Sequence, residues 1–355
     1  MLVCRMGGTP PRSASRRYRR ARRRLRGERG VVAVIGTLLA LLVFFTLFGV
    51  FLTEYLPLWM TENEAAFTSS TDLSFANFKS NVDTQYQFPS GVPSSLATPF
   101  TMSSQGVPLL AQPTEGTLAF LPSTCPKAFI VAPTVLNVGQ PVNSAYCMFA
   151  NITVSAGPGG SGPFSQHFAT GALEMILPNR YYSAETFFFE DDAVIQSQSG
   201  GYQVMTANAP LNITHSATGN TTVTDSLLQL YGNSSVYIAQ GGTVEYSHFR
   251  YSQPVTASGD LGPVNHTAIP FVFTFEIGTQ FPCAWTNFLK QTIAVSGLSS
   301  SNITLSYTPS TFVATPAACQ NTQGATTILT LNVYNVNFAK FYYAGVQVSN
   351  GVGGT

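Results

Sequence analysis

Side chains that could do chemistry are sparse in this chain of 355 residues. Its four histidines (His167, His215, His248 and His266) form no HExxH or other close ligand pair, so we expect no metal site. There is no GxSxG motif, and the glycine-rich stretch 157–163 lacks the Lys-Ser/Thr ending of a P-loop. We therefore expect no catalytic residue and no cofactor, and a membrane-tethered enzyme is the least favoured alternative.

Glu190-Asp191-Asp192 is the densest group of carboxylates outside the membrane region. Hard cations such as Ca²⁺ prefer several oxygen ligands, so a bound ion is one interpretation. Neighbouring residues of a strand point to opposite faces, however, and three in a row do not converge by themselves. We favour a solvated turn and keep the calcium site as the alternative.

The charge is low and unevenly distributed. Only 9% of residues are charged, against about 25% in ordinary soluble proteins. Eleven of the 17 basic residues are arginines before Val31, whereas the rest of the chain has six basic residues and fifteen acidic ones. We interpret residues 1–30 as a basic cytoplasmic leader; nucleic-acid binding is disfavoured, because a basic block before an apolar helix is a membrane topology signal. Met6 is an alternative start.

Residues 31–53 form an uncharged run of 23 residues. As a helix, this run covers roughly 34 Å, enough to cross a bilayer. No signal-peptidase pattern follows it, so the segment should stay as an anchor. The positive-inside rule places the N-terminus in the cytoplasm and the C-terminal domain outside, with Tyr55 and Trp59 in the outer aromatic belt.

Residues 54–88 are predicted to form an extracellular helical stalk. Pro57 should kink or end the membrane helix, and Thr61 to Glu64 has the form of a capping box for a second helix. The spacing of six residues fits one buried helical face: Phe67, Thr71, Phe75, Phe78, Val82 and Tyr86. Prolines and glycines then indicate an irregular linker over 89–127.

Residues 128–355 change to short runs rich in Val, Ile, Phe, Tyr and Thr between Gly, Pro, Asn and Ser clusters. This pattern predicts a mainly β fold, an extracellular antiparallel sandwich-like domain without long helices. The expected strands are 128–136, 145–154, 186–196, 203–207, 235–240, 244–247, 271–277, 303–307 and 329–333.

Four of the five cysteines lie in the part predicted to be exported: Cys125, Cys147, Cys283 and Cys319. An oxidising location favours disulfides over free buried thiols. Three pairings are possible, and we favour Cys125 with Cys147 and Cys283 with Cys319 because each pair is close in sequence.

Six sequons make the chain a candidate glycoprotein. Their asparagines are Asn151, Asn212, Asn220, Asn233, Asn265 and Asn302. Their number alone carries no weight in a chain so rich in Ser and Thr.

The junction Arg29-Gly30-Val31, followed by VAVIGTLLALLVFF, resembles the class III signal peptide of archaeal type IV pilins and pilin-like proteins. The resemblance implies cleavage by a prepilin-type peptidase after Gly30, with Val31 as the new N-terminus. It also implies that the helix from Val31 first anchors the subunit and then packs among related subunits of a filament. The fifth residue after the cut, Ile35, departs from the Glu of bacterial pilins, so that contact between subunits is absent.

A second stretch, from Tyr181 through Phe187 and Glu190 to Met205, is similar to one in large archaeal pilin-like proteins without assigned activity. The expected function is that of a cell-surface pilin-like subunit with a structural or adhesive role. The expected partners are the lipid bilayer, the prepilin-type peptidase and like or related pilin subunits. An unprocessed, single-pass anchored binding domain is the alternative.

Overall fold

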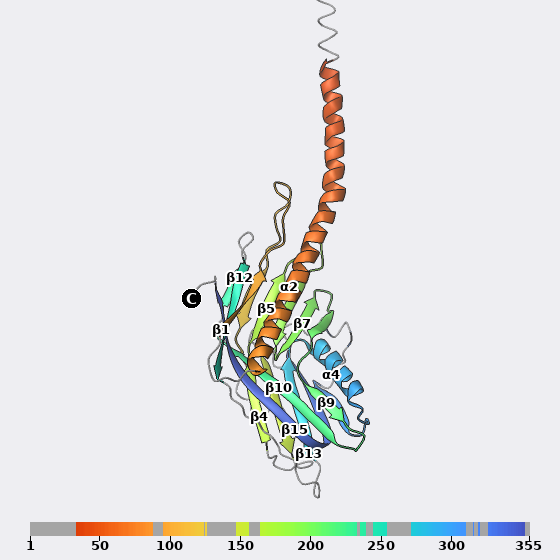
Figure 1. The fold of residues 1–355 in the computed structure, drawn as a ribbon. Helices are drawn as coiled ribbons and strands as arrows, with labels where there is room; N and C mark the ends of the chain where they lie inside the picture. The colour runs from red at the N-terminus through yellow and green to blue at the C-terminus, as the bar shows by residue number, and fades with distance from the viewer. Residues whose placement is uncertain are drawn as a thin grey trace, which may run out of the picture. The chain divides into compact units, whose positions relative to one another are not determined.

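The computed structural model describes residues 33–87, 95–123, 125, 147–155, 164–232, 235–238, 244–253, 271–309, 315, 319 and 326–351. The chain divides into two compact units, Met1–Trp59 and Met60–Thr355. The described part of the first unit is helical, and the second unit is mainly β (Figure 1).

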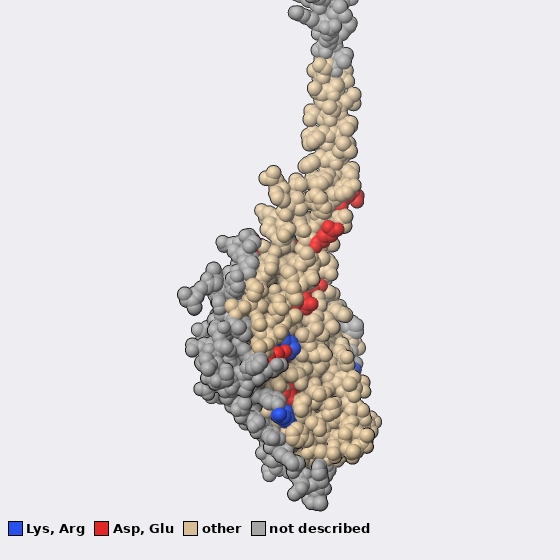
Figure 2. Space-filling model, viewed as in Figure 1, with Lys and Arg blue, Asp and Glu red and all other residues tan. Residues whose placement is uncertain are grey.

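The apolar helix is the dominant feature of the first unit. Residues 33–50 are α-helical, Phe51–Tyr55 form the π-helical turn η1, and Leu56–Gln87 form α2. In the most apolar window of this helix no residue is buried, and no residue between 33 and 53 is charged, as the tan segment in Figure 2 shows. By length and composition, it is the one helix in the described ranges that could cross a membrane.

The sequence predicted that Pro57 would kink or end this helix, and the structure excludes an end, because the helix continues to Gln87. Proline cannot donate to the carbonyl four residues earlier, and its ring crowds that carbonyl. In η1 the backbone N–H of Leu56 donates instead to the carbonyl oxygen of Phe51, five residues earlier, and such a wide turn gives the ring room. The predicted capping box, Thr61 to Glu64, therefore lies inside α2 and begins no second helix.

Fifteen strands have described bounds. They are β1 Ser95–Thr101, β2 Thr117–Leu121, β3 Met148–Ser155, β4 Phe164–Thr170, β5 Ala172–Leu177, β6 Glu185–Glu190, β7 Ala193–Gln198, β8 Gln203–Ala207, β9 Asn212–His215, β10 Thr221–Tyr231, β11 Ser235–Ile238, β12 Val244–Gln253, β13 Phe271–Thr279, β14 Ile303–Thr308 and β15 Thr327–Gly351.

These strands form two sheets. The six-stranded sheet has the order β11-β2-β5-β6-β7-β8. The nine-stranded sheet follows the path β1-β12-β15-β13-β3-β4, with β10 and β14 on β15 and β9 on β10. Every pair is antiparallel except β10 with β15, which is parallel.

The 25-residue strand β15 joins the parts of the larger sheet. Its first half pairs with β13 and β14, and its second half pairs with β10 and β12. Asn335, at φ 61°, lies directly before the residue where the partners change. Asparagine tolerates this left-handed conformation better than most residues, so the strand can redirect there without a break.

The two largest apolar clusters among the described residues of the second unit each take side chains from both sheets. β6 shows how they are divided: Phe188 belongs to one cluster, and Phe187 and Phe189 belong to the other. The six-stranded sheet is therefore covered on both faces. Helix α4, Pro282–Ser296, contributes the fully buried Trp285 to the first cluster.

α2 lies on the second cluster with the face expected from the sequence. Five of its predicted residues are buried: Phe67, Thr71, Phe75, Phe78 and Val82. The Phe75 ring stands edge-on to the ring of Phe100 of β1, with 5.2 Å between the ring centroids. It stacks with the ring of Phe187 of β6 at a centroid distance of 5.8 Å. This aromatic contact fixes the helix on the sheet.

Several expectations need correction. The supposed linker 89–127 contains β1 and β2, the strand expected over 186–196 is the hairpin β6–β7, and α4 was missed. Pro282 at the start of α4 and Gly297 at φ 73° after its end are the two local signals that could have revealed it. The strand expected over 128–136 lies outside the described residues.

The favoured cysteine pairs lie at disulfide distance. The Cα atoms of Cys125 and Cys147 are 4.6 Å apart, and those of Cys283 and Cys319 are 6.0 Å apart. The second pair joins the first turn of α4 to a distant segment of the chain.

We expect Phe75→Ala to lower the free energy of unfolding of the second unit by about 3–5 kcal/mol, because it leaves a cavity beneath α2. Leu73→Ala is the matched control, since Leu73 is 62% exposed on the same helix, and its effect should stay within about 0.5 kcal/mol. Denaturant titration of the detergent-solubilised chain measures both. Equal effects would contradict the seating of α2 described above.

Candidate functional site

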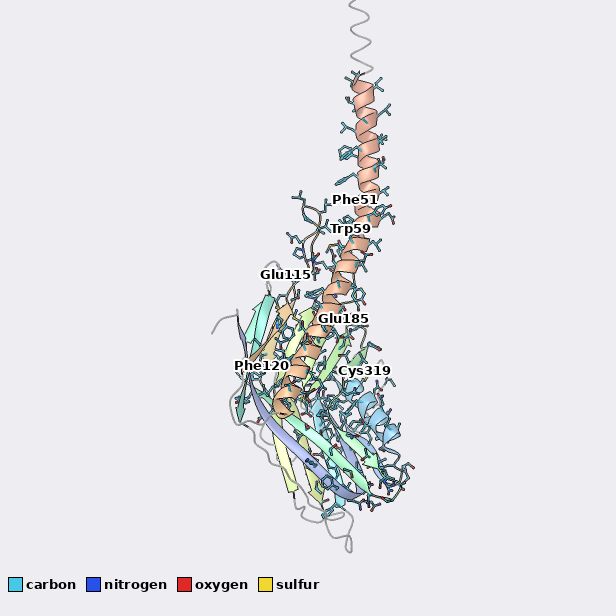
Figure 3. All side chains as sticks on the ribbon, viewed as in Figure 1. Phe51, Trp59, Glu115, Phe120, Glu185 and Cys319 are labelled. Atoms are coloured by element: carbon cyan, nitrogen blue, oxygen red, sulfur yellow. A yellow bond between two sulfur atoms is a disulfide. The ribbon has the colours of Figure 1, made fainter. Side chains whose placement is uncertain are left out.

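The helix seat, where α2 meets the six-stranded sheet and its loops, contains two charged contacts of the second unit. Two side chains of α2 contact the sheet through charged groups, Glu64 near its start and Lys79 near its end. In a chain with so few charges, the full burial of Glu64 and the partial burial of Lys79 indicate positions that fix the helix. Figure 3 shows α2 lying along the strands of this unit.

Glu64 is fully buried and accepts hydrogen bonds from two segments. The backbone N–H groups of Arg180, Tyr181 and Tyr182 donate to its carboxylate, at 2.7 Å for each tyrosine. The hydroxyl of Thr114 donates to Oε1. One carboxylate thus binds the turn after β5 and the loop between β1 and β2 to the helix.

Burial by itself would raise the pKa of Glu64, but the hydrogen bonds from Thr114 and the three backbone N–H groups outweigh it and lower the pKa. The side chain is therefore an anion in the folded state. Neighbouring contacts strengthen the same junction: Asn63 Nδ2 donates to the carbonyl oxygen of Gln105 at 2.9 Å.

Lys79 makes the second charged contact of the seat. Its Nζ lies 2.9 Å from Asp192 Oδ2 and donates to the backbone carbonyl oxygen of Asp192 at 2.8 Å. Asp83, one turn later on α2, is 3.4 Å from the same ammonium group. The lysine is thus shared between its own helix and the β6–β7 turn.

Glu190-Asp191-Asp192 lie at the turn between β6 and β7, as expected. This turn is buried, however, so the expectation that it is solvated is wrong. Glu190 and Ala193 pair across the hairpin, and the two residues between them have φ of 43° (Asp191) and 59° (Asp192). A two-residue hairpin loop needs positive φ at both positions, which aspartate tolerates. Glu190, Asp191 and Asp192 are at most 3% exposed.

These three carboxylates point to different partners. Glu190 Oε1 accepts hydrogen bonds from the Trp285 indole at 2.7 Å and from Thr279, and Asp191 Oδ1 accepts one from the Leu228 N–H at 3.2 Å. Within the described ranges, no three His, Cys, Asp or Glu side chains are grouped so that they could hold a metal ion. The geometry therefore supports a structural role for the run.

Asp225 of β10 adds a fourth buried carboxyl group. Its Oδ1 accepts from the Ser226 N–H at 2.9 Å, whereas Oδ2 has no hydrogen-bond partner. Burial raises the pKa of Asp225 to about 7. Burial also raises the pKa of Asp191, with Asp225 adding to the effect, and raises that of Asp192 despite Lys79. Burial therefore favours the protonated form of Asp191, Asp192 and Asp225, whereas hydrogen bonds favour the ionised form of Glu64.

Other predicted site residues are dispersed. Gly30 and Val31 lie outside the described residues, as do Asn233 and Asn265. Asn212, the first residue of β9, and Asn220, in the β9–β10 turn, are exposed, and Asn302 is half-buried.

Asn151 differs from the other sequons, because it is 1% exposed within β3 and donates to Glu276 at 3.4 Å. An acceptor must be accessible, so this position does not suit a glycan in the folded state.

The sequence missed Glu64 and Lys79 as residues of the seat, and Asp225 and Trp285 as neighbours of the buried acidic turn. Glu64 carried a signal, its spacing after Thr61, but the same spacing fits a helix start. The partners of these residues are more than 100 positions away along the chain in several cases, and no local pattern reveals them.

The chain matches no family model, no curated protein and no solved structure.

We expect Glu64→Gln to lower the free energy of unfolding by about 2–3 kcal/mol at pH 7, because the charge-assisted hydrogen bonds are lost. The lowered pKa of Glu64 makes its contribution present above the unfolded pKa and lost as pH falls through the folded pKa, so the difference should shrink below about pH 4. Glu62→Gln, on the exposed face, is the control. A pH-independent difference would argue against this assignment. Denaturant titrations across pH provide the test.

The effect of Asp225→Asn on the free energy of unfolding should depend on pH in the opposite sense to that of Glu64→Gln. A carboxyl group whose folded pKa is near 7 stabilises the fold below its unfolded pKa, near 4, and this contribution is lost as pH rises to about 7. As pH rises from about 4 to 7, the free energy of unfolding of the variant should therefore increase relative to that of the wild type. At pH 8 it should be higher than the wild-type value by about 1–3 kcal/mol. Asp72→Asn on the half-buried face of α2 controls for the lost charge. A difference that does not change between pH 4 and pH 8 would refute the prediction.

Proposed function

We propose that the chain is a membrane-anchored cell-surface subunit of the archaeal type IV pilin-like class, with a structural or adhesive role. One observation carries the proposal. A single helix, described from Ala33 to Thr84, is apolar and unburied in its first part and is held by a β domain in its later part. A pilin-type subunit needs both properties, because its helix must enter a bilayer and also carry a folded domain.

The leader supports the same proposal. Its eleven arginines precede the apolar helix, and the positive-inside rule then puts the β domain outside the cell. The resemblance around Gly30 adds cleavage by a prepilin-type peptidase, which would leave the helix on the mature protein.

The β domain is interpreted as sandwich-like. Both apolar clusters combine residues of the six-stranded and the nine-stranded sheet, as two sheets packed face to face would. Two cysteine pairs at disulfide distance suit an oxidising location outside the cell. In this proposal the helix seat transmits load between the anchor and the domain, because Glu64 and Lys79 bind distant segments to α2.

The first experiment is the intact mass and N-terminal sequence of the protein from its native membrane. A mature chain that begins at Val31, in the membrane fraction, is the expected result. An intact leader would leave an unprocessed, single-pass anchored binding domain, and a start beyond Thr53 would remove the basis for a membrane anchor.

Gly30→Val should block the cut, because the resemblance requires a small residue before it, and the uncut chain should accumulate in the membrane. Gly27→Val is the matched control, a glycine of the same leader away from the cut, and it should be processed as the wild type. Immunoblotting against a C-terminal tag separates the two forms. Processing of Gly30→Val at the wild-type rate would exclude this cleavage position.

A further inference from the structure

Lys79 and Asp192 hold an amine and a carboxyl group in direct contact inside the second unit. Lys79 Nζ lies 2.9 Å from Asp192 Oδ2, and it also donates to the backbone carbonyl oxygen of Asp192 at 2.8 Å. Two atoms of one residue therefore fix the position of the nitrogen. This nitrogen lies next to the carboxyl carbon, Cγ, that an amine attacks when it forms an amide.

Aromatic packing beside this contact keeps the two groups together. Phe78, the residue before Lys79 on α2, stands edge-on to Phe189 of β6, with 4.8 Å between the ring centroids. Both rings are fully buried. Groups that are held in a reactive arrangement behave as if their concentration were about 10⁵–10⁸ M, so the amine does not have to search for its partner.

Little water reaches the contact, because the side chains of Lys79 and Asp192 are only 16% and 1% exposed. Hydration is what stabilises an ammonium group and a carboxylate as separate ions, and burial removes this stabilisation. Transfer of one proton from Nζ to the carboxylate gives a neutral amine and a neutral acid. These are the forms that react with each other, since a neutral amine is a nucleophile.

The Asp192 carboxyl group is poorly stabilised as an anion despite the nearby lysine. Its Oδ1 is buried and has no hydrogen-bond partner. Burial raises the pKa of Asp192 well above its usual value, Lys79 opposes the rise, and the charge of Asp83 adds to it. The neighbouring carboxyl groups of Asp191 and Asp225 also have raised pKa values, because of burial. The surroundings of Asp192 therefore favour the acid over the carboxylate.

The turn itself gives no reason for aspartate at position 192. Asp192 is the second residue of the two-residue loop between β6 and β7 and has φ 59°. Glycine is the residue that such a loop favours most at this position. Aspartate tolerates the conformation, and its side chain is directed to Lys79.

Asp83 is placed to move the proton that amide formation requires. It follows Lys79 by one turn of α2, and its Oδ2 lies 3.4 Å from Nζ. A hydrogen bond joins its side chain to that of Asp192. A carboxylate in contact with both groups can accept a proton from Nζ and deliver it to the departing oxygen. The side chain of Asp83 is 38% exposed, so the released water has a way out beside it.

We propose that Lys79 and Asp192 form an intramolecular amide bond between Nζ and Cγ, which joins α2 covalently to the β6–β7 turn. The Nζ–Cγ bond forms and one Cγ–O bond breaks. The ammonium group gives up two protons, both of which end on the departing oxygen, and this oxygen leaves as water. Nothing is oxidised or reduced, so no co-reactant is needed.

This inference concerns the second unit alone and does not depend on the membrane anchor. The bond would connect residues that are 113 positions apart in the chain. In the proposed surface subunit, it would keep α2 attached to the β domain under load that breaks hydrogen bonds and ion pairs.

The test is peptide mass spectrometry of the full chain, purified in detergent, with its cysteines reduced and alkylated. Trypsin cuts after a lysine only when the side chain is free. We therefore expect no cleavage after Lys79, and a product that links this region to residues 181–250, the tryptic peptide that contains Asp192. The linked product should be lighter than the sum of its separate peptides by one water. Fragmentation of the product should place the link at Lys79 and Asp192.

Two results would overturn the proposal. Complete cleavage after Lys79, with residues 80–127 recovered as a separate peptide in full yield, would leave only the ion pair. A product that has lost one water within α2 would assign the link to Lys79 and Asp83 instead.

Three variants test the roles of the groups. Lys79→Arg keeps the positive charge but has no primary amine, and should give no linked product. Asp83→Asn should slow the appearance of the link in pulse-labelled chains by about 100-fold, because a carboxamide does not accept the proton. Asp72→Asn, on the half-buried face of the same helix, is the matched control and should form the link at the wild-type rate.

The unfolding transition of each variant, measured by denaturant titration, shows whether its second unit is folded. A folded Asp83→Asn chain that forms the link as fast as the wild type would refute the proton transfer assigned to Asp83. A linked product from folded Lys79→Arg would refute Lys79 as the source of the nitrogen.

Discussion

The buried carboxylate of Glu64 is the interaction on which the arrangement of the second unit depends. A charge removed from water is tolerated only where hydrogen bonds replace its hydration, and here three backbone N–H groups and one hydroxyl do so. These donors come from the β1–β2 loop and from the turn after β5. Without the anion both segments would lose a partner on the helix, so the position of α2 and the course of the β1–β2 loop are determined together.

The other charged contact works differently. Lys79 neutralises only part of a group that contains Asp192 and, close by, Asp191 and Asp225, and two carboxylate oxygens there have no hydrogen-bond partner. Burial holds protons on this group, whereas hydrogen bonds keep Glu64 ionised. The two ends of the seat therefore respond to pH in opposite senses, and the stability of the unit reflects their balance.

Local sequence patterns predicted the elements better than their contacts. The apolar run 31–53 and the helical face from Phe67 to Val82 were visible because helical periodicity depends only on nearby residues. The buried state of Glu190-Asp191-Asp192 was not, since it depends on α4 and β10, which are far away in sequence. The π-helical turn before Pro57 was missed because the sequence rule assumes an α-helical turn around proline.

The seat also shows which sequence signals are ambiguous. Glu64 after Thr61 has the same spacing whether it begins a helix or binds a distant turn, and only the backbone of residues 180–182 distinguishes the two. Low charge made the chain recognisable as unusual, but could not show that the few charges it has would be buried against α2.

The long strand β15 has a consequence for biosynthesis. β10, β12, β13 and β14 all pair with it, and it is made after each of them. Until the ribosome has passed residue 351, these strands keep open edges, and open edges are templates for association with other chains. A nascent chain that stalls before this strand would leave the larger sheet in pieces while α2 and the six-stranded sheet are already complete. Quality control could therefore distinguish finished from truncated chains by this one strand.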